Sequence, residues 1–285
     1  MFTVAGPPTL WTDTIAGHLI KHGEEVPVAK LNRRLFSVAM AVLVGTVGTA
    51  TPAHAGEEVV IESVVSVVEE ADGTISELTF TPAPDVTPAE LAETLTASGV
   101  PNVEVRTETA DSETAVQAAA CKVGTATTWP SSATCFVRWP TKGQARPIVD
   151  FLDWTSAAWP VGRATTEWNK VSGIDSIRRT PAGGCRSIAN CVDINSANYG
   201  KTGWIGKTYR QLNSAGTYHL NVSIYLNDYY ADTETTRWTA ACHEMGHALG
   251  LDHNASTGSC MYWQKVAGMS KYPSANDRAL IERYY

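Results

Sequence analysis

The stretch "HEMGHALGLDH", residues 243–253, holds three of the seven histidines in a chain of 285 residues. His243 and His247 are four residues apart, so on a helix they lie one turn above each other and present two imidazoles on one face. Gly250 can adopt the left-handed conformation that ends a helix, which would turn the chain back and bring His253 to the same point. Three neutral imidazoles leave a fourth coordination position open, as expected of a catalytic rather than a structural zinc site.

Glu244 follows the first of these histidines directly. Its side chain is too short to bind the same ion from there, but it can take the proton of a water that the ion activates. A short HExxH motif alone arises often by chance. Gly250, His253 and Met261 follow it at the positions expected for a zinc peptidase, and these additional residues favour that function. We expect Met261 to pack beneath the ligands as an apolar floor. His219, the only other histidine after residue 55, is expected to be a strand residue and not a ligand.

The HExxHxxGxxH pattern of residues 243–253, followed by Met261, resembles the metzincin zinc peptidases. Residues 238–263 are most similar to the matrixins, and the secreted bacterial snapalysin type is another relative. The resemblance implies an α+β catalytic domain with a mixed, twisted sheet of about five strands and three helices. It also implies a cleft beside an edge strand, here expected at residues 219–227, to which a peptide substrate would add as a further strand.

The sequence also departs from these relatives. The snapalysin type is similar to a variant of the motif with aspartate at the third ligand position, where this chain has His253. Astacins and serralysins carry a zinc-binding tyrosine two residues after the methionine, and this chain has Trp263 there. The chain before residue 121 contains no cysteine, so the inhibitory thiol of matrixins is missing, and no second histidine cluster for a structural zinc is found. Calcium is possible but not indicated, because no EF-hand loop is present. Three aromatic residues are expected to line the substrate pocket, with core packing as an equal alternative: Tyr262, Trp263 and Tyr272.

The N-terminal residues indicate export. Residues 28–55 combine a basic start, an apolar run over residues 35–47 and a small-residue end at Ala53-His54-Ala55, which together predict a secretory signal peptide. The apolar run is too short for a permanent membrane span. Residues 1–27 are expected to be a mis-assigned start, with Val28 as one possible first residue. The protein is therefore predicted to be secreted and extracellular, with no membrane association after signal removal.

All six cysteines follow residue 120. An even number in an exported chain implies disulfides, although their connectivity does not follow from sequence. Proximity suggests three pairs: Cys121 with Cys135, Cys185 with Cys191, and Cys242 with Cys260.

A small unit is expected at residues 56–106. Two β-branched apolar runs flank a turn at Asp72-Gly73, a helix opens with a capping box at Thr87, and a further strand follows, which predicts a β-β-α-β pro-segment. Residues 107–120 have no apolar period and read as a linker open to proteolysis.

The charge distribution separates this unit from the remainder. Residues 56–120 carry 14 Asp and Glu against a single Arg, whereas residues 121–285, the expected catalytic domain, carry 17 Lys and Arg against 12 Asp and Glu. Opposite charges favour mutual attraction over a nucleic-acid surface. We favour a propeptide that covers the catalytic domain over an accessory domain that stays attached, with latency from a carboxylate that reaches the metal as one possibility.

Periodicity predicts further elements within residues 121–285. Strands are expected at 135–140, 191–197 and 219–228, and helices at 159–173, 232–250 and 274–285.

The predicted function is a secreted zinc-dependent endopeptidase in which a zinc-activated water attacks the peptide bond and Glu244 is the general base. Its substrate is a protein or peptide bound as an extended strand, and the protein is expected to be a monomer. The alternative is a secreted zinc-binding or protein-binding module on an inactive scaffold. The intact Glu244 argues against that alternative, since binding of the metal does not need it. A gluzincin would need a glutamate ligand downstream, and the only later glutamate is Glu282 near the chain end.

Overall fold

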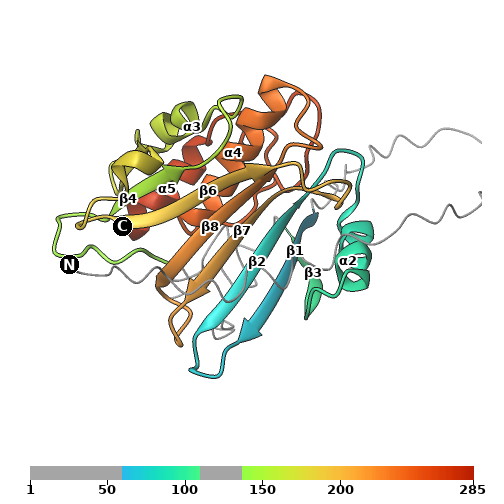
Figure 1. Cartoon of the computed structure of the whole chain (residues 1–285), viewed down its shortest axis with the longest axis horizontal. Coiled ribbons are helices and arrows are strands. Elements are labelled where there is room, and N and C mark those ends of the chain that lie inside the picture. The colour runs from blue at the N-terminus through green and yellow to red at the C-terminus, as the bar shows by residue number, and fades with distance from the viewer. Residues whose placement is uncertain (1–59, 110–136) are drawn as a thin grey trace, which may run out of the picture. The chain divides into compact units, whose positions relative to one another are not determined.

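The structure, a computed structural model, describes residues 60–109 and 137–285, which build one mixed sheet with helices on both of its faces (Figure 1). The eight strands of this sheet lie in the order β3-β1-β2-β7-β8-β6-β4-β5. The strands are β1 Val60–Glu69, β2 Ile75–Pro82, β3 Val103–Thr109, β4 Ile148–Asp153, β5 Asp175–Arg179, β6 Asn190–Ala197, β7 Trp204–Leu212 and β8 His219–Asn227. The helices are α2 Pro88–Ala97, α3 Val161–Trp168, α4 Glu234–Ala248 and α5 Ala275–Tyr284, with a short 3₁₀ turn at Pro181–Gly183.

The N-terminal unit has the expected β-β-α-β order, with β1 and β2 joined at the Asp72-Gly73 turn. The capping box at the start of α2 is formed, since Thr87 and Glu90 exchange both of its hydrogen bonds. The unit does not build a sheet of its own. Strand β2 pairs antiparallel with β7 from Ile75 to Pro82, so the prediction of about five strands is exceeded by the three strands that the N-terminal unit adds.

The expected position of the cleft edge is wrong. Strand β8, the predicted edge at residues 219–227, lies inside the sheet between β7 and β6. The outermost strands of the C-terminal part are β7 and β5, and the outer edge of β7 is taken by β2. Alternating burial identified β8 as a strand, but alternation describes the two faces of a strand and carries no information about its neighbours.

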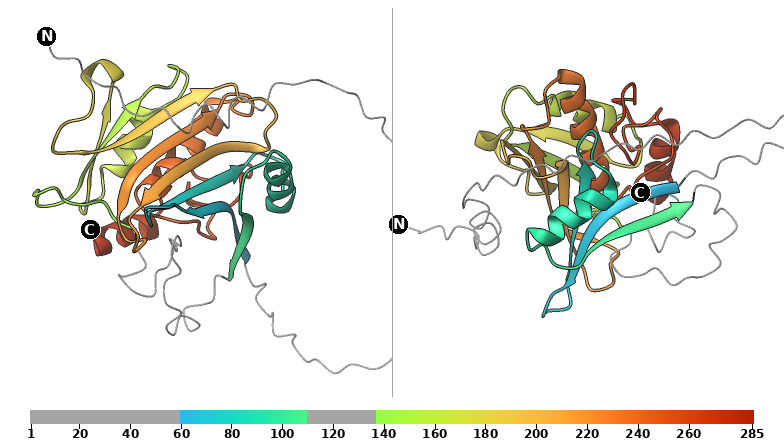
Figure 2. Two further views of the ribbon diagram at one scale, coloured as in Figure 1. Left: turned by 60° about the horizontal axis from the view of Figure 1, so that its bottom comes forward. Right: turned by 90° about the vertical axis from the view of Figure 1, so that its right-hand side faces the viewer.

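Helices cover the two faces of the sheet unequally (Figure 2). Helices α3, α4 and α5 pack on one face and share a large hydrophobic core with β4, β6 and β8, centred on residues such as Phe151, Trp168, Ile194 and Ile224. Helix α2 lies against β1 and β3 and covers a smaller cluster on the other face. Five buried residues define this α2 cluster: Val64, Phe80, Leu91, Leu95 and Trp204.

Local patterns found most helices but missed several strands. Helices α2, α3, α4 and α5 lie within the predicted ranges, whereas β4, β5 and β7 were not predicted. Strand β4 is buried throughout and so lacks alternation, and its Asp150 interrupts the apolar run while pairing with Arg186. The strand expected at residues 135–140 is wrong in its described part, where Arg138 forms only an isolated bridge with Tyr218.

Two disulfides are present, Cys185 with Cys191 and Cys242 with Cys260. The expected pair of Cys121 with Cys135 lies outside the described residues, as do the predicted signal peptide, residues 1–27 and most of the linker. Among the helices of residues 60–109 and 137–285, none combines the length and apolar character needed to cross a membrane.

Helix α4 packs unusually closely at Gly246, which gives a test of the core. A Cβ at this position would overlap the Met261 sulfur and lie 2.9 Å from Cζ2 of Trp168. Alanine is favoured over glycine in a helix by about 1 kcal/mol, yet we expect Gly246→Ala to lower the free energy of unfolding by about 1–3 kcal/mol through overpacking. Denaturant titration measures this change. Gly183→Ala, whose Cβ would meet its nearest atom at 3.5 Å, is the control; equal stability of both variants would contradict the packing described.

Candidate metal centre

Helix α4 carries the first two candidate ligands on its last turns. It begins after Thr233, whose hydroxyl accepts the N–H of Thr236 at 3.0 Å. His243 and His247 follow on one face, and both are completely buried. Gly250, at φ +96°, ends the helix in the left-handed region as its position predicts.

The turn after Gly250 brings His253, also fully buried, back to the two helical histidines. The Nε2 atom of His243 lies 3.1 Å from Nε2 of both His247 and His253. The three rings offer ligand atoms that all lie within 4.8 Å of one another. The three histidines that the sequence singled out therefore converge on one point.

The other ring nitrogens determine which tautomer each histidine adopts. Nδ1 of His243 lies 2.7 Å from the carbonyl oxygen of Cys260, and Nδ1 of His247 lies 2.9 Å from that of Leu251. Nδ1 of His253 lies 3.1 Å from the carbonyl oxygen of Glu62 on β1. A carbonyl oxygen can only accept, so each Nδ1 must donate a proton.

This arrangement fits a metal cation. Burial lowers the pKa of all three imidazoles, which keeps them neutral. In a neutral ring whose Nδ1 carries the proton, Nε2 is an unprotonated acceptor, and three such acceptors face one another in a buried space. They cannot hydrogen-bond to each other, whereas one cation satisfies all three. Three imidazole nitrogens with second hydrogen bonds to carbonyl groups are a donor set that suits zinc.

Met261 and the disulfide support the ligands from below. Met261 is fully buried and lies against Gly246. Gly246 stands between His243 and His247 in the sequence of α4. The Cys242–Cys260 disulfide joins α4 to the segment that precedes Met261, and Cys260 also supplies the carbonyl that orients His243. The disulfide thus holds the ligand helix and an orienting carbonyl together.

A buried network that the sequence analysis missed anchors the same segment. Asp277 in the first turn of α5 accepts hydrogen bonds from Ser259 at 2.5 Å and from Asn254 at 2.8 Å. It also accepts the N–H of Ser274, as the third residue of a capping box. The signal for that box, Ser274 followed three residues later by an acid, is visible in the sequence. Its role in holding the residues on either side of Met261 depends on tertiary contacts.

Glu244 is fully buried and its carboxylate is held by two hydroxyl groups. Thr208 on β7 donates to Oε2 at 2.7 Å, and Thr81 on β2 donates to Oε1 at 2.5 Å. Burial raises the pKa of Glu244 above its ordinary value, and the two hydroxyl hydrogen bonds act in the opposite direction. A Cβ at Gly206 would overlap this carboxylate, so the glycine in β7 makes room for it.

Lys265, four residues after Met261, is a second polar group that the sequence analysis missed. Its ammonium is buried without a hydrogen-bond partner among the described residues, and burial lowers its pKa. The ammonium and the Glu244 carboxylate interact electrostatically. The site therefore holds one acid and one base in a poorly solvated space.

The remaining predicted site residues lie around this centre. His219 is buried on β8 and stacks on Trp139 at 4.7 Å, as expected for a strand residue outside the metal cluster. Tyr262 and Trp263 have ring centres 5.9 Å apart, and Tyr272 packs on Trp238 at 5.4 Å. Their role in a substrate pocket stays a prediction.

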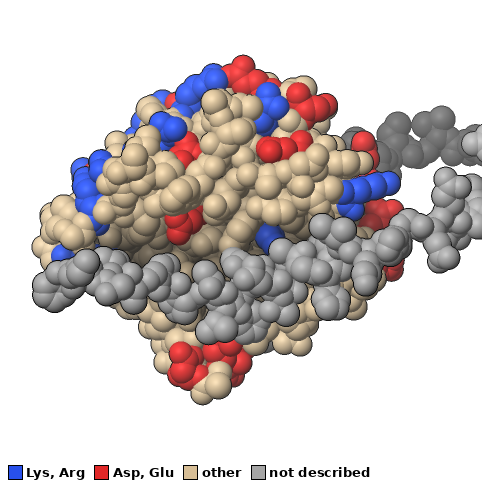
Figure 3. Space-filling view, viewed as in Figure 1, with Lys and Arg blue, Asp and Glu red and all other residues tan. Residues whose placement is uncertain are grey.

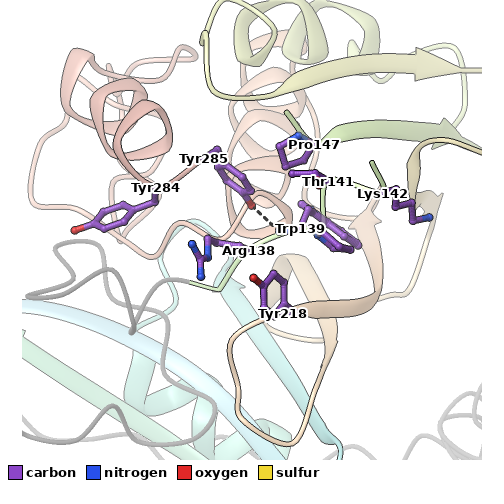
Figure 4. A pocket seen from close by; sticks show the side chains of 9 residues that line it. Arg138, Trp139, Thr141, Lys142, Pro147, Tyr218, Tyr284 and Tyr285 are labelled. Atoms are coloured by element: carbon purple, nitrogen blue, oxygen red, sulfur yellow. Dashed lines mark hydrogen bonds between the residues drawn. The ribbon is translucent and has the colours of Figure 1, made fainter. Parts of the chain in front are cut away.

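Two hollows of about 300 and 490 Å³ lie elsewhere, around Trp139, Pro140 and Lys142. Figure 4 shows the smaller one, which is lined by Tyr218, just before β8, and by Tyr285, just after α5. Neither hollow is lined by a member of the histidine cluster or by Glu244. The candidate metal ligands and Glu244 therefore lie outside these two hollows.

Comparison with known proteins agrees with this geometry. Residues 190–285 match the peptidase M10 family described as Matrixin, a range that runs from β6 to the C-terminus and includes the three histidines, Glu244 and Met261. No curated protein matches the chain significantly. The HExxH motif with its third histidine is intact and is consistent with one catalytic zinc.

Metal binding can be tested independently of activity. We expect the purified protein to contain one zinc per chain, and His247→Ala to lose it, because the cluster then keeps two ligands. A chelator should lower the unfolding temperature, since a ligand at a hundredfold its Kd adds about 2.7 kcal/mol to the free energy of unfolding. Metal analysis and thermal unfolding measure both effects. His219→Gln is the control and should retain one zinc; a metal-free wild type under zinc-replete conditions would contradict the site.

Proposed function

The chain carries a matrixin metallopeptidase domain, and from that premise we propose that it is a secreted zinc-dependent endopeptidase made with a pro-segment across its substrate cleft. One observation carries the proposal of activity. A buried glutamate, Glu244, follows the first of three convergent imidazoles and is hydrogen-bonded by hydroxyl groups alone. This is the arrangement that a general base beside a catalytic metal needs.

The residues divide the chemistry between them. Zinc, when held by the three histidines, supplies a Lewis acid for the scissile carbonyl and for water. Glu244 accepts the proton of the attacking water and returns it to the nitrogen of the leaving amine. Its raised pKa, which results from burial, brings the carboxylate closer to the range in which it can both take and give a proton near neutral pH.

A binding module without turnover is the alternative function. Such a module needs the three histidines but has no use for a carboxylate at Glu244. In this chain the fold makes room for that carboxylate at Gly206, although a glycine weakens a strand. We therefore favour the enzyme, and hydrolysis of casein with and without a chelator separates the two functions.

The substrate is expected to bind along β7. This strand is the antiparallel edge strand of the C-terminal part, and an extended peptide can add to such an edge through backbone hydrogen bonds. Strand β2 already occupies that edge in antiparallel pairing. The pairing supports residues 56–106 as a pro-segment that keeps substrate out of this edge. The disulfides of this chain fit an extracellular location, since disulfides persist in oxidising compartments.

The pro-segment also contacts the catalytic groups. Thr81 caps the Glu244 carboxylate, and on β1 Ser63 Oγ lies 2.8 Å from Nδ1 of His253 while Glu62 supplies its carbonyl. No carboxylate of the described residues belongs to the metal cluster, so an acidic group on the metal is not supported. Acidic residues instead gather at the tip of the β1–β2 hairpin, where Glu69 and Asp72 are exposed and Glu70 is half-buried (Figure 3). We propose that latency comes from these hydroxyl and carbonyl contacts and from the occupied edge.

Substitution of the base tests the proposed chemistry. Glu244→Gln should lower kcat on casein by a factor of roughly 10² to 10⁴, which is the usual contribution of general acid–base catalysis, while one zinc per chain is retained. Steady-state kinetics and metal analysis on the same preparation measure both quantities. Glu282→Gln is the matched control, since this glutamate lies on α5 and is exposed. Hydrolysis at the wild-type rate by Glu244→Gln would show that the base is assigned wrongly.

Processing tests the pro-segment. Active exported protein should begin after residue 106, and the full chain should hydrolyse casein much more slowly than the processed form. N-terminal sequencing of the active species, together with a time course of activity and chain length, measures this. An active species that still begins near Gly56 would instead indicate an accessory domain.

A further inference from the structure

A buried ion pair joins the pro-segment to β7. Glu77 on β2 and Arg210 on β7 are directly opposite each other in the antiparallel register. Their side chains are 1% and 3% exposed, and Arg210 donates from Nη2 to Oε1 of Glu77. Two charges are therefore buried together at the junction between the two parts of the chain.

Arg210 has no replacement partner of its own. Among residues 60–109 and 137–285, Glu77 is the one carboxylate that pairs with Arg210. The Nε and Nη1 atoms of Arg210 make no hydrogen bond within these residues. Removal of the pro-segment would leave this guanidinium on β7 without a counter-charge. Loss of one partner from a buried pair is strongly unfavourable, because the remaining charge is poorly solvated.

The position of this pair is fixed relative to the catalytic glutamate. Glu77, Thr79 and Thr81 alternate along β2 and are all buried, so they lie on one face of the strand. Thr81 contacts Glu244 and Glu77 contacts Arg210 on this face. The two contacts are four residues, or roughly 13 Å, apart along the strand. Any strand that pairs with β7 in this register places two side chains at the same two points.

We propose that Arg210 forms a substrate subsite that selects an acidic side chain four residues N-terminal to the substrate residue that faces Glu244. This inference rests on the proposed function, since it assumes that substrate replaces β2 on β7. In the full chain Glu77 of the pro-segment occupies this subsite. In the processed enzyme a glutamate of the substrate takes its place. A carboxylate there accepts charge-assisted hydrogen bonds, which are stronger than those of a neutral amide of the same shape.

Two peptides that differ in one group test the subsite. The first is a fluorogenic Ile-Ser-Glu-Leu-Thr-Phe-Thr-Leu-Ala-Ser, which follows residues 75–84 but has leucine in place of Pro82 and serine in place of Pro84. The second has Gln in place of its Glu. The exported protein, in the form that hydrolyses casein, should cleave the Glu peptide with a kcat/KM about tenfold or more above that of the Gln peptide.

The variants are chosen so that they fold. Glu77→Gln combined with Arg210→Gln removes both charges, so neither is left buried alone while the chain folds. We expect this double variant to lose the preference for Glu. Arg178→Gln is the matched control, since Arg178 pairs with Asp153 at the far side of the sheet and is 46% exposed. It should keep the preference.

Three outcomes decide the proposal. Equal cleavage of both peptides by the wild type, or a preference that persists in the double variant, overturns the subsite while casein hydrolysis still supports the enzyme. Absence of any hydrolysis, casein included, contradicts the proposed function instead. The two labelled peptides are then compared by fluorescence anisotropy on the same proteins. Tighter binding of the Glu peptide that the double variant loses supports the subsite, and equal or absent binding overturns it.

Discussion

Each imidazole of the metal centre is held in one tautomer by a backbone carbonyl, and the site depends on this constraint. The three carbonyls belong to Cys260, Leu251 and Glu62, which lie in three different segments. Each segment is secured separately, by the Cys242–Cys260 disulfide, by the left-handed turn at Gly250 and by β1 within the sheet. Three Nε2 acceptors can face one another only because the Nδ1 donors of the same rings point outward to the carbonyl groups. A bound cation would accept the lone pairs of all three Nε2 atoms.

The N-terminal unit, residues 60–109, contributes groups to the centre. It supplies one of the three orienting carbonyls, from Glu62, and the Thr81 hydroxyl on the catalytic carboxylate. Both contacts follow from the order β3-β1-β2-β7, which places β2 on the outer edge of β7 and β1 next to β2. A chain without a cysteine in this region can thus be restrained by neutral groups, whose contacts end when the strands separate.

The sequence predicted features that depend on near neighbours. The convergence of His243, His247 and His253 followed from helical spacing and a glycine, and helix α2 followed from its capping box. Matching between distant segments was not predictable. Strand β7 was not predicted, and its pairing with β2 joins residues more than a hundred positions apart.

Single residues show the same division. Gly206 in β7 signals a close approach of some other group, but only the fold identifies that group as Glu244. Arg210, Lys265 and Thr81 are unremarkable in sequence, and their importance comes from burial beside charges on other elements. The opposite net charges of the two parts were visible beforehand. The buried pair of Glu77 and Arg210 that links them could be located only through the strand register.

The α2 cluster has a consequence for the lifetime of the protein. There Trp204 of β7 shares a small hydrophobic cluster with Phe80 and Leu91 of the N-terminal unit, so the proposed removal of that unit would take these buried contacts from the peptidase domain. A domain shortened in this way need not refold after denaturation. Its persistence outside the cell would then be governed by the height of its unfolding barrier and not by an equilibrium between folded and unfolded chains.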